Sequence, residues 1–485
     1  MADRVEIPGF IGGSYPERAI GFDSERSINL YPVVGSPTTR SQMMLVNTPG
    51  LEFILNVGSG PIRGIQRTQN YWYVVCGNSV YQIDAALTVI QATGTLATNG
   101  GKVGLSYNNN KQLAIVDGQN LYICTTESVS PALSTITTNI LGNPTSVCFI
   151  NNYFIISLLN TQQFQWSANN DGTTWSATDT NFASNSSNNL VAVAASNGYV
   201  YMLGTDQVEV WSNNPSQITI GAVTISFPFN YTGTIIPYGL AGALTVINIE
   251  NGLAWLTSTN LTSPHIIFTQ GSQGAVISTP AMEQLIASFG NYSNAFCMAS
   301  HQQGQETLII SFPSAPATIC YDFRTQLFHE RSSYNGQMWL PIDVEAFGEN
   351  VEIAGDSTTG NLYYLMPNVY TDNGQPIVKQ RICPHNANMN EQMTVYRIEV
   401  LFEQGVGLPS GQGSKPIASI ECSTDYGHTY NFKRNEFMGE MGEYNKRVYW
   451  NRFGVGRDFV YRLTISDPVP VKIIKAWAEF EIGEH

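Results

Sequence analysis

The stretch FPSAPATICYDFRTQLFHERSS, residues 312 to 333, gathers charged and ionisable side chains in a chain that is otherwise poor in charge. These side chains are Asp322, Arg324, His329, Glu330 and Arg331. A histidine beside a carboxylate can act as a general base, so His329 with Glu330 or Asp322 is a candidate catalytic pair. Nothing nearby supplies a nucleophile. We therefore interpret the five residues as an assembly site, made of turn residues and contacts between elements or subunits.

Other motifs that carry chemistry are missing from the sequence. It has no G-x-S-x-G elbow, no phosphate-binding G-x-x-x-x-G-K-[ST] loop and no H-E-x-x-H metal helix. The glycine-rich segment GVGLPSGQG, residues 405 to 413, has the wrong spacing for a phosphate loop, and we expect a hairpin loop there. Paired acids such as Asp206 and Glu209 offer a weak case for glycoside hydrolysis. We expect no catalytic residue, no metal ligand and no cofactor.

The segment STDYGHTY follows the pattern S-x-D-x-G-x-T-aromatic of an Asp-box turn. The pattern is made by Ser423, Asp425, Gly427, Thr429 and Tyr430. In such a turn the Asp accepts hydrogen bonds from turn amides and the Gly takes a positive φ, so its role is structural. SANNDGTTW, residues 167 to 175, is a looser version. Asp boxes occur in sialidase propellers, but that resemblance implies three arginines around the ring, and residues 68 to 323 contain none.

Charge is unevenly distributed along the 485 residues, whose net charge is −14. Between residues 68 and 323 the only basic residues are Lys102 and Lys111, which argues against a nucleic-acid groove there. From 379 to 485 acidic and basic residues are balanced. We therefore expect a second, chemically different domain from about residue 370.

The seven cysteines are far apart and form no C-x-x-C pair, which is typical of buried free thiols in a protein made in a reducing cytosol. The N-terminal residues lack the pattern of a secretory signal, and no apolar run is long enough for a membrane-spanning helix. We expect a protein that neither spans a membrane nor follows that secretory route.

A repeat organises the middle of the chain. Each unit has an apolar strand, a tight polar turn and a second strand, and aligned positions recur at intervals of 41, 42, 44, 47, 66 and 42 residues. The aligned positions are Tyr81, Tyr122, Phe164, Val208, Trp255, Tyr321 and Tyr363. Short strands at a period of 40-odd residues predict a β-propeller. We count seven blades, with six as the alternative because residues 256 to 280 could hold an insertion.

The chain is therefore predicted to be all-β and to have three parts. Residues 1–60 form a platform segment or a strand that completes the ring, 61–367 the propeller, and 368–485 a β-sandwich-like domain. Low charge and many Gly, Asn, Ser and Thr residues favour turns and strands over helices.

The last domain carries a set of basic residues in NKRVYWNRFGVGRDFVYRL. They are Lys446, Arg447, Arg452, Arg457 and Arg462. Alternating apolar residues predict a hairpin with GVG as its turn, flanked by Arg452 and Arg457. Three interpretations stay open for this basic set: a solvated face paired to local acids such as Asp458, salt bridges between subunits, or contact with DNA. Of the last two, we favour salt bridges between subunits over contact with DNA.

Several rare strings stand in one order along the chain: INLYPVV (28 to 34), NTPGLEFI (47 to 54), ISTPAMEQLI (277 to 286), the stretch from 312, and MGEMGEYNKRVYWNRFGVGRDFVYRLTISDPVPVKIIKAWAEFE. Together they resemble the packaged-DNA stabilisation proteins of short-tailed bacteriophages, from about residue 14 to 481.

The resemblance implies a hexameric tail hub or nozzle below the portal and adaptor, with residues 1–60 facing the adaptor. Such a ring continues and helps close the DNA channel, retains the genome and permits its ejection. Implied partners are further copies of the chain, the adaptor and portal, tail spikes, fibres or a needle, and DNA passing non-specifically. The location would be the virion tail after synthesis in the host cytoplasm. A non-catalytic propeller scaffold and a glycan-binding or glycan-cleaving tail component are the alternatives.

Overall fold

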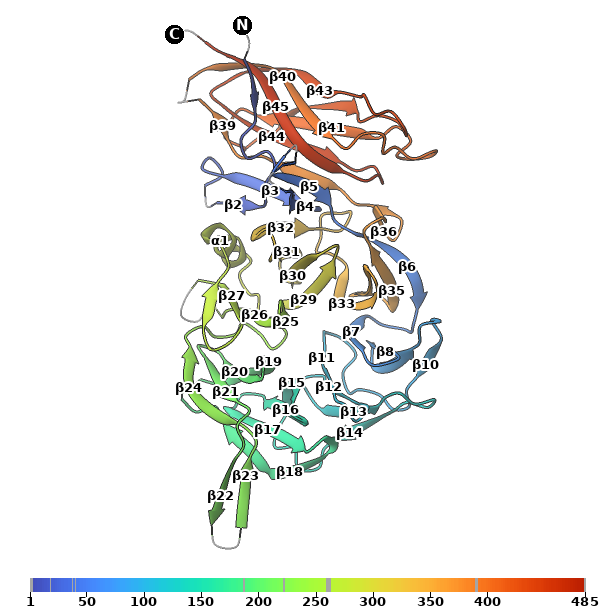
Figure 1. Cartoon of the computed structure of the whole chain (residues 1–485), viewed down its shortest axis with the longest axis vertical. Helices are drawn as coiled ribbons and strands as arrows, with labels where there is room; N and C mark the ends of the chain where they lie inside the picture. The colour runs from blue at the N-terminus through green and yellow to red at the C-terminus, as the bar shows by residue number, and fades with distance from the viewer. Residues whose placement is uncertain are drawn as a thin grey trace.

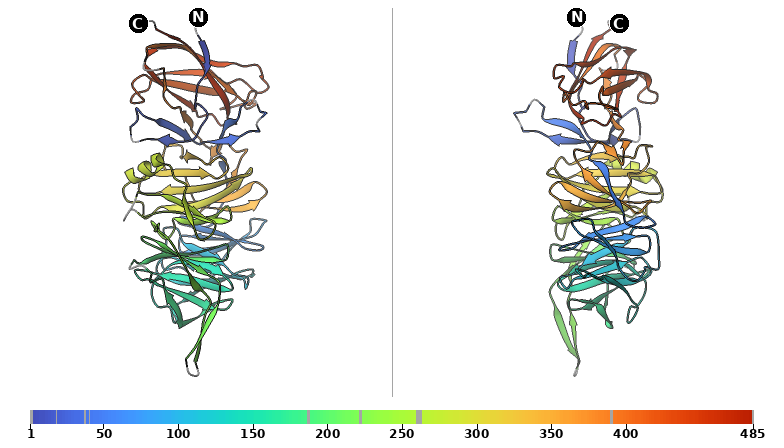
Figure 2. Two further views of the ribbon diagram at one scale, coloured as in Figure 1. Left: turned by 60° about the vertical axis from the view of Figure 1, so that its left-hand side comes forward. Right: turned by 90° about the vertical axis from the view of Figure 1, so that its right-hand side faces the viewer.

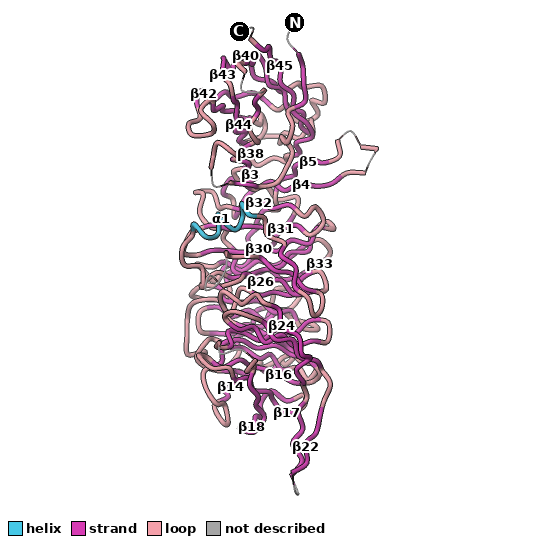
Figure 3. Tube along the Cα trace, turned by 90° about the vertical axis from the view of Figure 1, so that its left-hand side faces the viewer, coloured by secondary structure: helices cyan, strands magenta, loops and turns pink. Residues whose placement is uncertain are grey.

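The described chain consists of strands joined by turns and loops, apart from one short helix (Figure 3). The computed structural model describes residues 3–17, 19–36, 38–39, 41–185, 188–220, 223–258, 263–388 and 391–483. Within these ranges α1 (Pro280–Ser288) is the only helix. Thr279 caps it by accepting a hydrogen bond from the Met282 amide, and Pro280 occupies the first helical turn, where no amide partner is needed. The prediction of an all-β chain is confirmed.

Four-stranded antiparallel units follow one another around a ring (Figure 1). The first contains β7 (Ile62–Arg67), β8 (Trp72–Cys76), β9 (Ser79–Ile83) and β10 (Val89–Gln91). The second contains β11 (Gly104–Tyr107), β12 (Gln112–Val116), β13 (Leu121–Thr125) and β14 (Ala132–Ile136). The third contains β15 (Pro144–Ile150), β16 (Tyr153–Leu158), β17 (Gln163–Ala168) and β18 (Asp171–Phe182). The fourth contains β19 (Leu190–Ser196), β20 (Tyr199–Gly204), β21 (Val208–Ser212) and β24 (Asn230–Ile236).

The remaining units complete the propeller. The fifth contains β25 (Val246–Ile249), β26 (Gly252–Leu256), β27 (Ile266–Thr269) and β28 (Gly274–Val276). The sixth contains β29 (Phe296–Gln302), β30 (Gln305–Phe312), β31 (Ala317–Asp322) and β32 (Leu327–Arg331). The last contains β33 (Pro341–Gly348), β34 (Val351–Asp356), β35 (Asn361–Met366) and, from the N-terminal segment, β6 (Gly50–Asn56). Because β6 pairs with β35, the two ends of the propeller are joined by hydrogen bonds.

Tight turns explain why these units form locally. The turn between β15 and β16 has two positive-φ residues, Asn151 and Asn152, and that between β19 and β20 has Asn197 and Gly198. Two positive φ values in a two-residue loop give a type I′ turn, whose twist matches that of the flanking strands. Asn and Gly tolerate this conformation, which is why the Asn-rich composition suits the fold.

The sequence repeat coincides with the third strand of most units, because six of its seven aligned positions lie there. Trp255 differs and lies on β26, the second strand of its unit. The described part of the stretch 256 to 280 contains β27 and β28 and the first residue of α1, and residues 259 to 262 lie outside the described ranges. In the fourth unit a hairpin of β22 (Ser216–Ile220) and β23 (Val223–Phe227) lies between β21 and β24 in the chain and projects beyond the ring (Figure 1).

The C-terminal domain is a sandwich of two sheets. One sheet is built from β4 (Leu30–Val34), β5 (Met43–Asn47), β45 (Lys472–Ile482), β40 (Met393–Phe402) and β43 (Val448–Gly456), with β1 (Asp3–Glu6) on β45. The other is built from β38 (Lys379–Ile382), β44 (Asp458–Ile465), β41 (Ile417–Ser423) and β42 (Asn431–Phe437), with β39 (Asn386–Ala387) on β44. Three short strands complete the chain: β2 (Tyr15–Pro16), β36 (Thr371–Asp372) and β37 (Gln375–Pro376).

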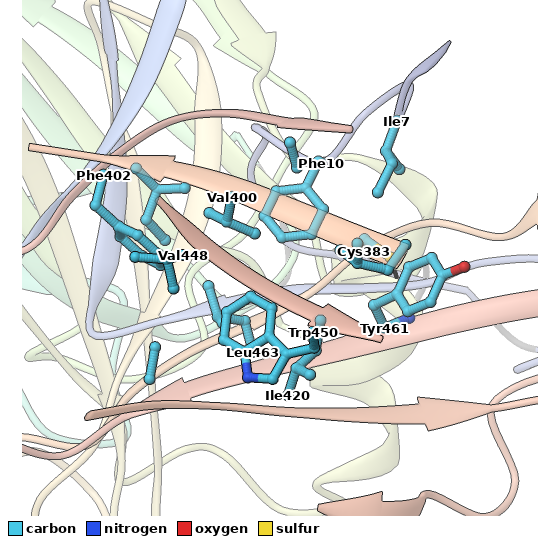
Figure 4. Packing of buried hydrophobic residues seen from close by; sticks show 14 of the residues in the cluster. Ile7, Phe10, Cys383, Val400, Phe402, Ile420, Val448, Trp450, Tyr461 and Leu463 are labelled. Carbon is cyan, nitrogen blue, oxygen red and sulfur yellow. Dashed lines mark hydrogen bonds between the residues drawn. The ribbon is translucent and has the colours of Figure 1, made fainter. Parts of the chain in front are cut away.

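Apolar side chains from both sheets fill the space between them (Figure 4). Val400 and Trp450 belong to one sheet, and Ile420 and Leu463 to the other. Phe10 from the N-terminal segment is also buried in this core. Burying one such side chain contributes roughly 1.5–3 kcal/mol, so the sandwich depends on residues that precede the propeller in the chain.

One strand joins the two domains. β3 (Ser24–Ile28) pairs with β32 in parallel at Ile28 and Glu330, and with β38 in antiparallel register. Propeller and sandwich therefore share one continuous sheet and stack into an elongated body, with the two chain ends together at the sandwich (Figure 2). We call β32, β3 and β38 the junction strands.

Candidate functional site

The charged cluster lies on the sixth propeller unit at the junction strands. Residues 327 to 331 form β32, so His329, Glu330 and Arg331 lie on a strand of the unit and not in a turn. Asp322 ends β31 and accepts hydrogen bonds from the amides of Arg324 and Thr325, at 3.1 and 3.3 Å, and from Thr325 Oγ1 at 2.7 Å. Asp322 is buried and Arg324 is exposed. The Asp322 carboxylate thus holds the turn that leads into β32.

Glu330 ties the propeller to the N-terminal segment. Its carboxylate accepts from Arg26 Nε at 2.9 Å and from Ser14 Oγ at 3.1 Å, and it forms an ion pair with Arg26 Nη2. Both partners belong to residues before the propeller, although Glu330 lies more than 300 positions later. The carboxylate is therefore a contact between β32 and β3 and is not free to assist His329.

His329 and Arg331 lie on the other face of β32 and are buried, with exposed fractions of 2% and 5%. The Arg331 guanidinium lies over the Trp339 ring at 4.4 Å, and the His329 ring lies 5.9 Å from that of Tyr31. Burial, with a smaller contribution from Arg331, lowers the pKa of His329 to about 3. A ring so poorly basic and so buried is not placed to act as a general base near neutral pH.

Arg381 holds the junction together, although nothing in the sequence pointed to it. Its side chain is fully buried and donates to the carbonyl oxygens of Gly9, Phe10 and Gly13 at 2.6 to 2.8 Å. It also donates to Ser27 Oγ at 3.0 Å and pairs with the Glu25 carboxylate. One guanidinium on β38 thus holds both β3 and the loop before it. A single Arg in the string KQRIC gives no signal of this role.

The Asp-box residues form a closed turn on the sandwich. Asp425 accepts from Ser423 Oγ at 2.6 Å, from the Thr429 amide at 2.8 Å and from Thr429 Oγ1 at 2.6 Å. These bonds lower the pKa of Asp425. Gly427 has a φ of +84° and donates its amide to Ser423 Oγ. Tyr430 lies beneath the Arg462 guanidinium at 4.1 Å. The turn's hydrogen-bonding groups are used internally.

The looser Asp box and the paired acids are also engaged in local bonds. Asp171 accepts from the amide and hydroxyl of Thr173 at 2.9 and 2.7 Å. Glu209 accepts from the Asn185 amide at 2.8 Å and from Trp211 Nε1 at 3.2 Å, and Asp206 accepts from Asn188. Asp206 and Glu209, the two acids considered for glycoside hydrolysis, therefore both accept hydrogen bonds from neighbouring groups.

Three members of the C-terminal basic set form ion pairs. Arg447 donates to Glu399, which also pairs with Arg4 at 3.1 Å. Arg462 pairs with Glu421 at 2.9 Å and Lys446 with Glu436 at 3.7 Å. Each partner lies on the same sandwich.

Arg452 and Arg457 are exposed, but the hairpin predicted around them is wrong. β43 pairs with β40 and β44 pairs with β41 and β38, so the two strands belong to opposite sheets. Residues GVG continue β43, and the chain crosses between sheets near Arg457. Both predicted strands exist; alternation alone could not tell that each pairs elsewhere.

A cavity of about 440 Å³ lies along the propeller axis. Lys102, from the connection between the first two units, donates to the Cys297 carbonyl at 3.0 Å and to Asp343 Oδ1 at 2.9 Å. Cys297 and Asp343 lie on β29 and β33, the innermost strands of the last two units. This lysine therefore bridges the interior of the ring.

All seven cysteines are free and buried, as expected. Within the described ranges, no three His, Cys, Asp or Glu side chains gather as a metal site would require. Nor does that part of the chain contain a helix of the length and apolarity needed to cross a membrane.

Three solved structures illustrate the general likeness to other proteins. YCF48 from Cyanidioschyzon merolae is 10% identical with a TM-score of 0.42, and the match covers 66% of this chain and 99% of the YCF48 chain. Apo AztD from Citrobacter koseri is 11% identical with a TM-score of 0.36, covering 69% and 88%. The extracellular domain of BT4673 from B. thetaiotaomicron is 9% identical with a TM-score of 0.43, covering 88% and 58%. No curated protein sequence matches the chain.

Two family models match nearly all of the sequence. The model described as bacteriophage P22 Gp10, β-propeller, matches residues 5–370, and the one described as bacteriophage P22 Gp10, β-sandwich, matches residues 380–481. Their order agrees with the domains described above and with the resemblance found in the sequence. The chain therefore belongs to the bacteriophage P22 Gp10 family of packaged-DNA stabilisation proteins and is a phage structural protein.

Proposed function

We propose that the chain forms the hub, or nozzle, of a short-tailed phage tail, as a hexameric ring below the portal and adaptor. In this role it continues the DNA channel, helps to close it, retains the packaged genome and permits its ejection. The protein acts without catalysis, as a part of the virion tail that is made in the host cytoplasm.

The observation that carries the proposal is the shared sheet at the junction strands. Domains within a chain commonly meet at modest interfaces that permit relative motion. Here β3 bonds to both domains, Glu330 and Arg381 hold the same segment from either side, and the core of the sandwich includes Phe10. A ring that holds packaged DNA would benefit from subunits that do not hinge in this way.

The propeller axis is a poor path for DNA, which supports a channel between subunits. The cavity on this axis has a volume of about 440 Å³, the size of a small-molecule pocket, and Lys102 bridges it. A DNA duplex is too wide to pass through such a cavity, since its major groove alone is about 12 Å wide. The duplex would instead run along the axis of the ring. Residues 68 to 323 carry only two basic residues, so the propeller offers few phosphate contacts that would hold a sliding duplex.

The adaptor and portal would bind one end of the ring, and spikes, fibres or a needle would attach to it. The residue roles follow from the same proposal: Asp322, Arg324, His329, Glu330 and Arg331 stabilise the subunit for assembly, and the C-terminal basic set serves contacts between subunits. A non-catalytic scaffold outside a tail is the alternative. Asp206 and Glu209, being used in local bonds, do not favour glycan cleavage.

Mass photometry of the purified protein, alone and with portal–adaptor complexes, tests the proposal. We expect the complex to gain the mass of six copies, and negative-stain images to show rings of that copy number. A protein that stays monomeric and leaves the mass of the portal–adaptor complex unchanged would contradict the hub. Binding of oligosaccharide by such a monomer would instead support the glycan alternative.

A further inference from the structure

A small cavity lies beside the charged cluster, on the face of β32 that carries His329 and Arg331. Its volume is about 20 Å³. It lies between the sixth propeller unit and the N-terminal segment. Six of its polar lining residues are more than nine-tenths buried: Tyr31, Ser300, Gln302, Thr307, His329 and Arg331. Gln303, which is exposed, and Gln305, which is partly buried, complete the polar lining. Bulk solvent therefore contributes little to the hydrogen bonding of the six buried side chains.

Several atoms in this lining have no protein partner among the described residues. They are Nε and Nη1 of Arg331, both ring nitrogens of His329, and Oε1 of Gln302. Other lining groups are engaged: Ser300 Oγ donates to Glu352 at 2.7 Å, and Tyr31 Oη donates to Gln303 at 3.2 Å. Buried polar groups in folded proteins almost always have a partner, either protein or ordered water.

We propose that one ordered water molecule occupies this cavity and joins Arg331, His329 and Gln302. A water site needs about 10–15 Å³ and two to four polar neighbours, and the cavity provides both. The water accepts from the Arg331 guanidinium and donates to Gln302 Oε1 or to the unprotonated nitrogen of His329. It thereby links β32, a junction strand, to β29, the innermost strand of the same unit.

Donor and acceptor chemistry favours water over a small anion. His329 is neutral near pH 7, because burial and Arg331 lower its pKa to about 3. A neutral imidazole presents one donor and one acceptor, and Gln302 Oε1 is a second acceptor. An anion only accepts hydrogen bonds, so it would leave both acceptors unpaired. Water can both donate and accept.

Burial raises the pKa of the carboxyl groups of Glu352 and Asp372, and the positive charge of Arg331 opposes this rise. No carboxylate in the described ranges approaches the Arg331 guanidinium closely enough for an ion pair. The choice of water over an anion therefore rests on the two acceptors, the unprotonated nitrogen of His329 and Gln302 Oε1.

The direct test is a high-resolution crystal structure of the full chain, determined with and without a bromide soak. We expect a density peak within hydrogen-bond distance of Arg331 and Gln302, with no anomalous signal from bromide. A bromide signal at this position would overturn the proposal in favour of an anion site. A well-ordered lining with no peak would overturn it in favour of a dry cavity.

A second test uses His329→Phe, which keeps a planar ring and removes both nitrogens. If water bridges the three residues, the water loses one of its hydrogen-bond partners in this variant, and the melting temperature of the protein falls by a few degrees. If the cavity is dry, removing an unpaired buried polar group raises the melting temperature. His428→Phe, the same exchange at an exposed histidine, should shift it by less than His329→Phe. Should His329→Phe fail to fold, the density at the site still decides.

Discussion

The two sets of charged residues that stand out in the sequence have opposite environments. His329, Glu330 and Arg331 are buried on β32, where Glu330 binds Arg26 and Ser14 of the N-terminal segment, whereas Arg452 and Arg457 are exposed on the sandwich. Exposed ion pairs contribute little to stability because water and salt screen them. Buried pairs that lose one partner leave a charge without compensation, which is costly. Burial therefore decides which charges hold this chain together, although both sets look alike in the sequence.

The largest effect is expected at Arg381. Arg381→Met removes a fully buried guanidinium together with its bonds to three carbonyl groups, and it leaves Glu25 without its partner. We expect a loss of roughly 3–5 kcal/mol in the free energy of unfolding. The matched variant Arg462→Met breaks a partly exposed pair with Glu421 and should cost about 1 kcal/mol or less. Urea unfolding followed by tryptophan fluorescence compares the two; equal losses would refute the role of burial.

A smaller loss is expected at Glu330. Glu330→Gln keeps the size of the side chain but removes the charge that binds Arg26, and it weakens the bond from Ser14. Hydrogen bonds to charged groups contribute about 1.5–3 kcal/mol, so we expect a loss in that range. Glu440→Gln, which breaks an exposed pair with Lys415 on the sandwich, is the control, with a loss of at most about 1 kcal/mol. Limited proteolysis should also show earlier cleavage near β3 in Glu330→Gln; unchanged cleavage would contradict the bridging role.

These contacts show what the sequence could and could not predict. Strand period and turn residues are local, so the β-propeller, the β-sandwich-like domain and the Asp-box pattern could be inferred from neighbouring positions. The pairing of β32 with β3 joins residues about 300 positions apart, and no local pattern contains it. The predicted hairpin at 446 to 462 failed for the same reason: β43 and β44 alternate correctly but pair with β40 and β41. Arg381 was missed because its partners are mostly backbone carbonyls, which any sequence supplies.

Burial should also make the stability near the junction depend on pH. Burial raises the pKa of Asp372 to about 7, against the opposing effects of Arg331 and Lys379. The unfolded carboxyl titrates near 4, so the stability that protonated Asp372 contributes is present at low pH and is lost as pH rises towards 7. The Asp372→Asn variant has no carboxyl to ionise and so does not lose this stability. Its free energy of unfolding, relative to that of the wild type, should therefore increase between pH 5 and 8 by on the order of 2 kcal/mol.

Asp425→Asn is the matched control for this pH dependence. Its hydrogen bonds lower the pKa of Asp425, so the group stays ionised in both folded and unfolded chains from pH 5 to 8. The difference in free energy of unfolding between Asp425→Asn and the wild type should therefore not change with pH over that range. Urea midpoints at several pH values measure both differences, and parallel curves for Asp372→Asn and wild type would contradict the effect of burial. Because His329 titrates identically in wild type and variant, its opposite contribution below pH 6.5 cancels in the comparison.

The smallest effect on stability, and the sharpest test of the exposed set, is expected for the double variant Arg452→Glu and Arg457→Glu. Both residues are exposed, so the subunit should lose no more than about 0.5 kcal/mol per substitution. If they form salt bridges between subunits, charge reversal should weaken ring assembly on the adaptor, as measured by mass photometry. If they contact DNA, rings should form normally while filled heads lose genome, because fewer phosphates are neutralised. Lys415→Glu, at an exposed pair on the same domain, controls for the change in net charge. Normal rings with full genome retention would leave these arginines as a solvated face, and the contrast between the two charged sets would then be one of stability alone.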